Sequence, residues 1–497
     1  MRHIDRSAPT LTRALASALL LGFVGCQGDA GSPTGPASLP ELATTASAPA
    51  VEGRWETAFS TPVVAVHMHQ LRTGKVLLWG DQGNAYLWAS GTGFTPVTKP
   101  FRIYCTGHTF FPDGRLLVMG GTSPETRGLR YATVFDPSSG QFSATSSMAQ
   151  GRYYPTATTL PDGGILVISG HDTAKAVVTI AEIRTSTGWR RLTTAPLAID
   201  APFYPAMFVA PNGKVFLAGF PPTTRYLDVS GTGHWTTVAT RKVGDRRLGS
   251  AVMYAPGKIL YAGGGDPPTA SAEVIDLNQA SPAWRTVPGM AFARRQTNAT
   301  LLADGSVLVT GGTSGPGFND QAGAVHYAEL WNPKTESWAI MAPEARTRTY
   351  HSTAILLPSG KVLSSGSGEG GGIALANSEH SAQIFDPPYL FKSDGSLAVR
   401  PSIASAPAKL GYGQSLTVQT PDAGSVTRGN LIRLSSVTHA FNQSQLIFPL
   451  TFAKTGSTSI KAVSPSNARL APPGPYMLFL INGSGVPSVA KIVMVGP

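Results

Sequence analysis

Tyr350 and His351 stand side by side in RTRTYHSTAILLPSGKVLSSG, residues 346–366, directly ahead of an apolar run and a turn. Both can ligate a metal ion, the tyrosine through its phenolic oxygen and the histidine through a ring nitrogen. Neighbouring strand residues point to opposite faces of a sheet, so a core tyrosine beside a surface histidine is the simpler interpretation. A shared metal site requires an irregular backbone here, such as a twist or bulge.

The segment that carries this pair is one of seven copies of a hairpin pattern: an apolar strand, a turn ending in glycine, a second apolar strand and a further glycine. The turn glycines recur at intervals of 40 to 55 residues, at Gly74, Gly114, Gly163, Gly213, Gly257, Gly305 and Gly360. Asp-Gly and Asn-Gly between apolar runs are strong hairpin signals. Seven such units predict an all-β fold, with a seven-bladed kelch-type β-propeller over residues 52–397.

The sequence pattern changes after the seventh copy. Residues 398–497 contain short alternating runs, including SLTVQTP, LIRLSS, LIFPLTF and YMLFLING, separated by turn clusters. This pattern and length predict a C-terminal immunoglobulin-like β-sandwich.

The repeats also align residues of different blades without coordinates. Eight positions before the residue that precedes the turn glycine lie Cys105, Tyr154, Tyr204, Gln296 and His351, while the first and fifth copies have Ala65 and Leu248. We expect all these positions to surround one mouth of the central channel. A single Tyr or His there is more often a packing residue, but convergent polar groups in a concave site favour a functional one.

Cys105 and Tyr154 occupy the same register in consecutive blades, so we expect them to be in contact. A thiol beside a phenol is a poor hydrogen-bond pair, but near a redox metal the sulfur can be oxidised onto the ring. Tyr and His ligands with an open coordination position suit copper(II) better than magnesium or calcium. The alternative for Cys105 is a buried and inert thiol.

The N-terminus reads as a targeting segment. Residues 1–25 combine three arginines with an apolar run too short to span a bilayer, and are predicted to be an export signal. LGFVGC favours a lipoprotein signal that would lipidate Cys26, against ordinary cleavage nearby. Residues 26–51 are predicted to be a flexible tether. We therefore expect an exported protein, held at a membrane surface or in the periplasm by a lipid anchor, or secreted.

The formal net charge of +11 comes from scattered basic residues, with no Lys/Arg block interleaved with aromatics. This distribution indicates a solvated basic surface and argues against a nucleic-acid partner. GEGGG at residues 368–372 lies in a propeller loop with no following helix, so a nucleotide cofactor is not expected. The sequence does not indicate an oligomeric state.

Five ordered stretches resemble the copper radical oxidases, the family of galactose oxidase and glyoxal oxidase: YCTGHTFFPDGRLLVMGG, GRYYPTATTLPDGG, RTYHSTAILLPSGKV, IFDPPYLF and VTHAFNQSQLIFPL. The resemblance implies a copper ion bound by Tyr154, Tyr350, His351 and His439. It implies a radical on Tyr154, joined to Cys105 by a thioether bond. It also implies that a hairpin of the C-terminal domain carries His439 up the propeller channel.

The chain departs from the galactose-acting relatives and looks closer to the glyoxal oxidase branch. Those relatives carry a sugar-binding arginine after the tyrosine that matches Tyr204, where this chain has Pro205. They also stack a tryptophan over the radical, where this register offers His171 and Asp172. Tyr204, Gln296 and His171 are therefore the candidate residues of the substrate pocket.

The resemblance implies oxidation of a small aldehyde or primary alcohol by dioxygen, giving a carboxylic acid or aldehyde and hydrogen peroxide. Tyr350 would take the proton of the substrate hydroxyl, and the Tyr154–Cys105 radical would take a hydrogen atom from the adjacent carbon. The alternative is a non-catalytic kelch propeller lipoprotein that binds a surface glycan or a protein. That alternative gives no reason for Tyr154, Tyr350, His351 and His439 to occur together.

Overall fold

A computed structural model describes residues 48–199 and 203–497 of the chain. The predicted export signal, Cys26 and the tether up to residue 47 lie outside the described residues. The described chain is almost entirely β-structure; its helices are α1 (Pro49–Glu52) and the short 3₁₀ turns η1 (Leu375–Asn377) and η2 (Pro388–Leu390). In the described part of the chain, no helix has the length and apolar composition needed to cross a membrane.

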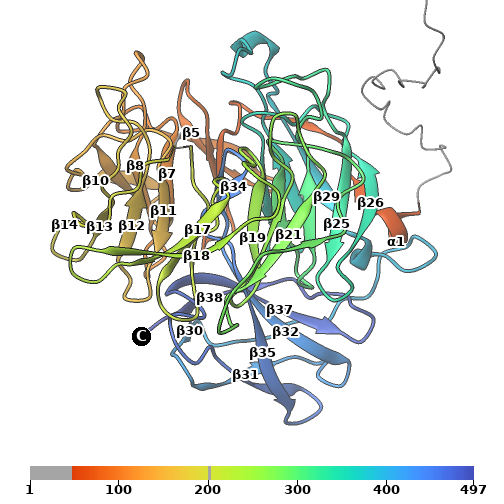
Figure 1. The fold of residues 1–497 in the computed structure, drawn as a ribbon. Helices are drawn as coiled ribbons and strands as arrows, with labels where there is room; N and C mark the ends of the chain where they lie inside the picture. The colour runs from red at the N-terminus through yellow and green to blue at the C-terminus, as the bar shows by residue number, and fades with distance from the viewer. Residues whose placement is uncertain (1–47, 200–202) are drawn as a thin grey trace, which may run out of the picture. The chain divides into compact units, whose positions relative to one another are not determined.

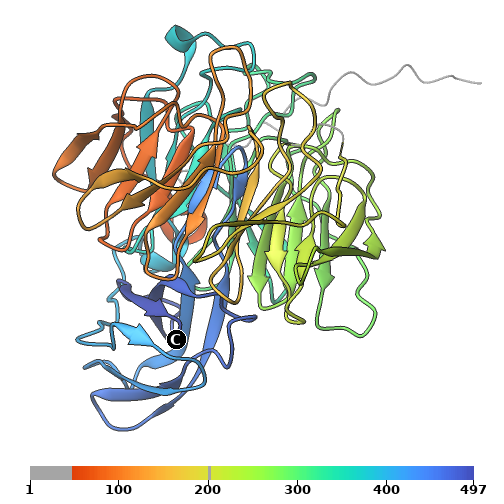
Figure 2. The ribbon, with the colours of Figure 1, turned by 90° about the vertical axis from the view of Figure 1, so that its left-hand side faces the viewer.

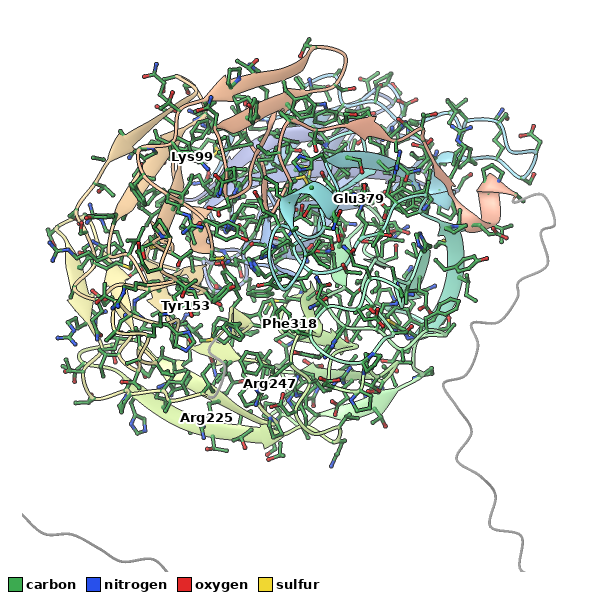
Figure 3. The ribbon with its side chains drawn as sticks, turned by 90° about the horizontal axis from the view of Figure 1, so that it is seen from above. Lys99, Tyr153, Arg225, Arg247, Phe318 and Glu379 are labelled. Carbon is green, nitrogen blue, oxygen red and sulfur yellow. The ribbon has the colours of Figure 1, made fainter. Side chains whose placement is uncertain are left out.

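Seven sheets stand around a central axis, which confirms the predicted seven-bladed propeller (Figure 3). The innermost strands are β3 (His67–Gln70), β7 (Thr106–Phe110), β11 (Thr156–Thr159), β15 (Met207–Val209), β19 (Ser250–Ala255), β23 (Asn298–Leu301) and β27 (Thr353–Leu356). The second strands are β4 (Val76–Trp79), β8 (Leu116–Gly120), β12 (Ile165–Ile168), β16 (Val215–Leu217), β20 (Lys258–Ala262), β24 (Val307–Thr310) and β28 (Val362–Ser365).

The outer half of each blade is more exposed. The third strands are β5 (Ala85–Ala89), β9 (Ala132–Asp136), β13 (Glu182–Arg184), β17 (Thr223–Asp228), β21 (Ala272–Asp276), β25 (Tyr327–Asn332) and β29 (Ser381–Asp386). The outermost strands are β6 (Gly93–Val97), β10 (Gln141–Ala144), β14 (Trp189–Arg191), β18 (His234–Thr240), β22 (Arg285–Val287) and β26 (Ser337–Pro343). The inner hairpins, by contrast, are formed by the apolar runs of the repeat, and they pack against neighbouring blades on both faces.

The seventh blade takes its outer strands from the start of the described chain. β1 (Arg54–Trp55) and β2 (Phe59–Ser60) both pair antiparallel with β29. The Arg54 guanidinium also donates to the Asp386 carboxylate at 3.0 Å. This pairing closes the ring, because the beginning and the end of the propeller share one sheet.

The C-terminal domain is a β-sandwich, as predicted, built on a seven-stranded path. Its strands are β30 (Lys409–Leu410), β31 (Ser415–Gln419), β32 (Val426–Arg433), β35 (Ile447–Lys454), β36 (Ser459–Val463), β37 (Gly474–Asn482) and β38 (Lys491–Val495). Its own core contains Leu416, Val418, Ile460, Leu478 and Val493.

One hairpin leaves this sandwich and enters the propeller. β33 (Ser436–Thr438) pairs antiparallel with β3, and β34 (Phe441–Asn442) pairs with β33, so the first blade becomes a six-stranded sheet. In Figure 1, β34 lies in the middle of the propeller, well above the other C-terminal strands, and Figure 2 shows the same hairpin between the blades. Every residue from Ser435 to Gln445 is buried. The hairpin therefore fills the channel of the propeller.

Candidate metal centre

A single backbone feature turns the aligned residues of six blades toward the axis. Cys105, Tyr154, Tyr204, Leu248, Gln296 and His351 all have positive φ angles, between 47° and 69°. Backbone hydrogen bonds join them across blades, with Tyr154 N–H donating to the Cys105 carbonyl at 2.9 Å and Tyr204 N–H to the Tyr154 carbonyl at 3.0 Å. Left-handed backbone is uncommon for residues other than glycine. Its recurrence ahead of six inner strands is therefore a regular feature of the fold, which we call the kink.

This kink explains how Tyr350 and His351 share one site. His351 has φ 69°, and the regular strand β27 begins only at Thr353. The rings of Tyr350 and His351 consequently stack, with centroids 3.8 Å apart and planes 27° apart. The irregularity is thus a left-handed turn ahead of the strand and not a bulge within it.

In the imidazoles of His351 and His439, a hydrogen bond donated at Nδ1 makes Nε2 the ring nitrogen that carries the lone pair. His351 Nδ1–H donates to the Gly368 carbonyl at 2.6 Å, and His351 Nε2 is buried without a hydrogen-bond partner. Thr438 Oγ1–H donates to the Val66 carbonyl, so this oxygen accepts the His439 Nδ1–H at 2.6 Å. Each ring therefore keeps its Nε2 lone pair for another ligand.

Two phenols and a thiol complete the cluster. The Tyr154 and Tyr350 hydroxyl oxygens lie 3.0 Å apart, and Cys105 Sγ lies 4.0 Å from His439 Nε2. One ligand atom from each of Cys105, His351 and His439 lies within 4.8 Å of the other two. His439 comes from the turn of the β33–β34 hairpin and the others from blades two, three and seven, so the C-terminal domain and the propeller build the cluster together.

Burial sets the protonation of these groups. It lowers the pKa of His351 to about 4 and that of His439 well below its ordinary value, so both imidazoles are neutral at neutral pH. Burial also raises the pKa of the Tyr154 and Tyr350 phenols and of the Cys105 thiol. A bound cation would reverse this effect for the phenols, because it stabilises their ionised forms.

The chemistry of these donors fits copper. Neutral imidazole nitrogens, phenolic oxygens and a sulfur surround the centre, and the described cluster contains no carboxylate. Magnesium and calcium prefer oxygen-only sites, whereas imidazole suits copper. The buried His351 Nε2 without a partner is the kind of polar atom that a metal ion satisfies.

A second group of histidines, which the sequence did not lead us to predict, forms a hydrogen-bonded chain that begins at the Cys105 backbone. His67 Nε2 accepts the Cys105 N–H at 3.1 Å, so His67 Nδ1–H donates to His108 Nε2 at 3.0 Å. His108 Nδ1–H in turn donates to Ser436 Oγ at 2.6 Å, and His69 Nδ1 lies 3.0 Å from the same oxygen. The two histidines in VHMHQ and the one in CTGHT, all in inner strands, were the available signal.

A small cavity lies over the cluster. Its lining residues are Tyr154, Phe203, Tyr204, Leu248, Phe318, Tyr350 and His439. Tyr204 thus reaches the predicted pocket, and its hydroxyl donates to the Thr106 carbonyl at 3.1 Å. Gln296 lines a neighbouring small cavity with Tyr350, His351 and His439, and its Nε2 donates to the Phe318 carbonyl at 2.5 Å. Phe318 lies in a sixth-blade loop that the repeat alignment does not cover.

Aromatic rings cover Tyr154. The Tyr153 ring lies 4.8 Å away with planes tilted by 51°, and the Phe203 ring meets it edge-on at 4.7 Å. The third candidate pocket residue, His171, is not among the residues that line these two cavities. Its ring lies 5.0 Å from the Tyr153 ring and 5.9 Å from the Phe203 ring, so it packs behind residues that cover Tyr154. Tyr153 and Phe203 therefore cover the Tyr154 ring.

Comparisons with known proteins agree with this architecture. Residues 400–495 match the family model described as "Galactose oxidase-like, Early set domain". Galactose oxidase of Gibberella zeae is 30% identical over 490 residues, covering 89% of this chain and 70% of that protein. Aldehyde oxidase GLOX of Vitis pseudoreticulata is 27% identical, covering 81% of this chain and 84% of that protein. A solved fungal alcohol oxidase of the AA5 family, in complex with copper, superposes with a TM-score of 0.82 at 27% identity, over 90% of this chain and all of that one.

Proposed function

The chain belongs to the copper radical oxidase family, and from this premise we propose that it oxidises a small aldehyde or primary alcohol with dioxygen. The products are a carboxylic acid or an aldehyde, together with hydrogen peroxide. The observation that carries the proposal is the pair of Nε2 lone pairs on His351 and His439, next to two phenol oxygens 3.0 Å apart. A packing cluster would have no need to leave the buried His351 Nε2 without a partner.

Tyr154, Tyr350, His351 and His439 would hold the copper ion. Copper bound there supplies one-electron redox chemistry, which pairs with a radical on Tyr154 to accept the two electrons of the substrate. Tyr350, as a phenolate, takes the proton of the substrate hydroxyl. Tyr154, as a phenoxyl radical, takes the hydrogen atom of the adjacent carbon. The two hydrogens leave with dioxygen as hydrogen peroxide, which balances the reaction.

The radical requires a modified Tyr154. In our proposal Cys105 Sγ forms a thioether bond to a ring carbon of Tyr154, and the thiol hydrogen and the ring hydrogen are both lost. Dioxygen is the oxidant for this step. Electrostatic contact between Cys105 and Tyr154 supports the assignment, because a side-chain hydrogen bond from Tyr154 partly offsets the burial that raises the pKa of Cys105. The His67 ring, which accepts the Cys105 N–H, acts as a positioning residue.

Copper loading followed by a peroxide assay on small aldehydes and primary alcohols tests the activity. Cys105→Ala should keep copper binding but lose most of the peroxide production, whereas His439→Ala should lose the copper itself. Mass spectrometry of tryptic peptides should show a cross-link of Cys105 to Tyr154 with a loss of two hydrogens in the wild type. Full activity of Cys105→Ala would remove Cys105 from the mechanism, and failure to bind copper would favour a non-catalytic binding propeller.

The proposal also includes the place where the protein works. We infer export to the cell surface or periplasm, with lipidation of Cys26, from the sequence of residues 1–26. Cell fractionation with Cys26→Ser tests this. The variant should release the protein from the membrane fraction if Cys26 is the anchor, and should change nothing if the signal is cleaved elsewhere.

A further inference from the structure

A larger cleft adjoins the small cavity over the metal centre. Its volume is about 390 Å³, and it shares Phe203, Leu248 and Phe318 with that cavity. Figure 3, seen from above, places Phe318 near the middle of this face and Arg247 beside it toward the rim. A substrate with its hydroxyl at Tyr350 and its reacting carbon at Tyr154 would therefore extend its remaining atoms into this cleft.

The rim of the site is divided into an aromatic part and a basic part. The residues directly before the six left-handed positions are Tyr104, Tyr153, Phe203, Arg247, Arg295 and Tyr350. Four are aromatic, and the two from the fifth and sixth blades are arginines that both line the cleft. The exposed Arg247 donates to Asp245 at 2.9 Å through its Nε. Arg295 is different in both burial and pairing.

Arg295 is buried with more than half of its N–H donors unused. Its side chain is only 3% exposed, and its Nη1 lies 3.2 Å from Asp266 Oδ2 and 3.4 Å from the Gly265 carbonyl. Its Nε and Nη2 have no hydrogen-bond partner. These two nitrogens form one edge of the guanidinium, and their parallel N–H groups match the two oxygens of a carboxylate.

Other buried arginines do not share this arrangement. Arg152 and Arg294 each leave Nε unpaired, but their Nη2 atoms donate to Glu182 and Glu329 within their own blades. Among the buried arginine side-chain atoms of the described ranges, only those of Arg295 leave both Nε and Nη2 of one guanidinium without a partner. An unsatisfied buried donor costs stability, so such an edge calls for a ligand.

We propose that Arg295 binds a carboxylate of the substrate, so that the enzyme acts on aldehyde acids or hydroxy acids. The inference rests on the proposed oxidase activity. Asp266 holds the far edge of the guanidinium and leaves the Nε/Nη2 edge for the substrate, while Phe318 and Phe203 contact its carbon chain. Oxidation of an aldehyde acid hydrate by dioxygen then yields a dicarboxylic acid and hydrogen peroxide.

Kinetics with paired substrates tests the assignment. Oxo acids of two to five carbons are compared with their primary amides, which match them in shape but carry no charge. Arg295→Leu should raise KM for the acids about ten- to hundredfold, the range for a lost charged hydrogen bond, and leave KM for the amides unchanged. Arg225→Leu, on β17 outside the cleft, is the matched control and should change neither. An equal effect of Arg295→Leu on acids and amides would overturn the proposal.

Equilibrium binding separates this inference from the oxidase activity itself. Calorimetry with copper-loaded and copper-free protein should show binding of succinate, no binding of succinamide, and loss of succinate binding in Arg295→Leu. Asp266→Asn removes a competing negative charge and keeps Arg295, so it should bind succinate more tightly even if Arg295→Leu fails to fold. If no substrate yields peroxide, the proposed function fails, and the calorimetry still decides the role of Arg295. Equal affinity of wild type and Arg295→Leu for succinate would refute that role.

Discussion

The direction of six side chains around the candidate metal centre depends on one repeated backbone angle. Each left-handed residue costs about 1–2 kcal/mol relative to right-handed backbone, yet six blades repeat it at the same register. A regular strand would send Tyr350 and His351 to opposite faces, whereas the turn at His351 stacks their rings. The strain occurs where it brings candidate ligands from different blades to one point.

The sequence predicted which residues meet but not how. The repeat register located Cys105, Tyr154, Tyr204 and His351 because turn glycines are readable in sequence. The left-handed angle was not readable, because tyrosine, cysteine and histidine carry no strong preference for it. Arg295 was missed for a different reason, since its role depends on unpaired donors that only coordinates reveal.

The buried histidines predict an acid-sensitive fold for the copper-free protein. Burial lowers the pKa of His108 to about 3 and that of His69 well below its ordinary value. The unfolded chain takes up these protons near pH 6.5 and the native protein does not. Stability is therefore complete above about pH 6.5 and falls by up to about 1.4 kcal/mol per pH unit per histidine as the pH decreases toward the native pKa.

Thermal unfolding between pH 7 and pH 5 measures this dependence. His108→Gln should have a flatter profile than the wild type in this range, whereas His234→Gln, at an exposed position of β18, should keep the wild-type slope. Parallel profiles for His108→Gln and the wild type would contradict the explanation. The buried Glu344 and Glu369 do not cause this loss, because burial raises the pKa of both carboxyls, and a raised carboxyl pKa makes stability increase as the pH decreases.

At the scale of the element, buried ion pairs hold the segment before the left-handed residue in three blades. Arg152–Glu182, Arg246–Glu273 and Arg294–Glu329 recur in blades three, five and six, at 2.7 to 3.0 Å. Each arginine lies two residues before the left-handed residue, and each glutamate lies in the third strand of its blade. Each glutamate also accepts backbone N–H groups from the segment before its arginine, as Glu329 does from Ala291 and Phe292.

These ion pairs have a recurring pattern in the sequence, in addition to the hairpin repeat. AEI, AEV and AEL occur in β13, β21 and β25, each following an arginine at a similar distance. The seventh blade has AQI there, and its Arg348 pairs instead with Glu344, four residues earlier. The apolar pattern predicted the number of blades and the positions of the strands. It did not predict these buried charged residues, because charged side chains are usually expected to face solvent.

Glu329→Gln should destabilise the protein by about 3–5 kcal/mol, because it leaves the Arg294 charge buried without a counter-ion. Urea unfolding measures the loss. Replacing both partners, with Arg294→Met added, should recover part of it. The exposed pair of Arg285 and Glu336 gives the control, and Glu336→Gln should cost no more than about 1 kcal/mol. A similar cost for both single variants would show that the buried pair is not what secures the blade.

At the scale of the whole molecule, the β33–β34 hairpin joins the C-terminal domain to most of the ring. Gln443 Oε1 accepts the Ala157 N–H at 2.7 Å in the third blade, and Gln445 Oε1 accepts the Leu301 N–H at 3.0 Å in the sixth. Ser250 of the fifth blade donates to the Ala440 carbonyl at 2.7 Å. These bonds satisfy inner-strand groups that would otherwise face an empty channel, and they fix the height of His439.

Gln443→Leu combined with Gln445→Leu should therefore weaken two properties together. The free energy of unfolding should fall by about 1–3 kcal/mol for each N–H left unpaired, and copper affinity should fall because His439 loses its support. Titration against a competing chelator measures the affinity, and Gln419→Leu, exposed in β31 of the same domain, is the control. Unchanged copper affinity in the double variant would mean that the hairpin holds His439 without these bonds.

The position of this hairpin near the C-terminus also determines when the candidate metal centre can form during folding. Cys105 and His439 are separated by 334 positions in the sequence, and Tyr154 and Tyr350 by 196. Contacts between such distant residues form late, because the intervening chain must be ordered first. The proposed ligand set is therefore incomplete until nearly the whole chain has been synthesised and the ring has closed around its final hairpin. Under the proposed mechanism, the centre cannot form its radical during synthesis and becomes reactive only in a finished molecule.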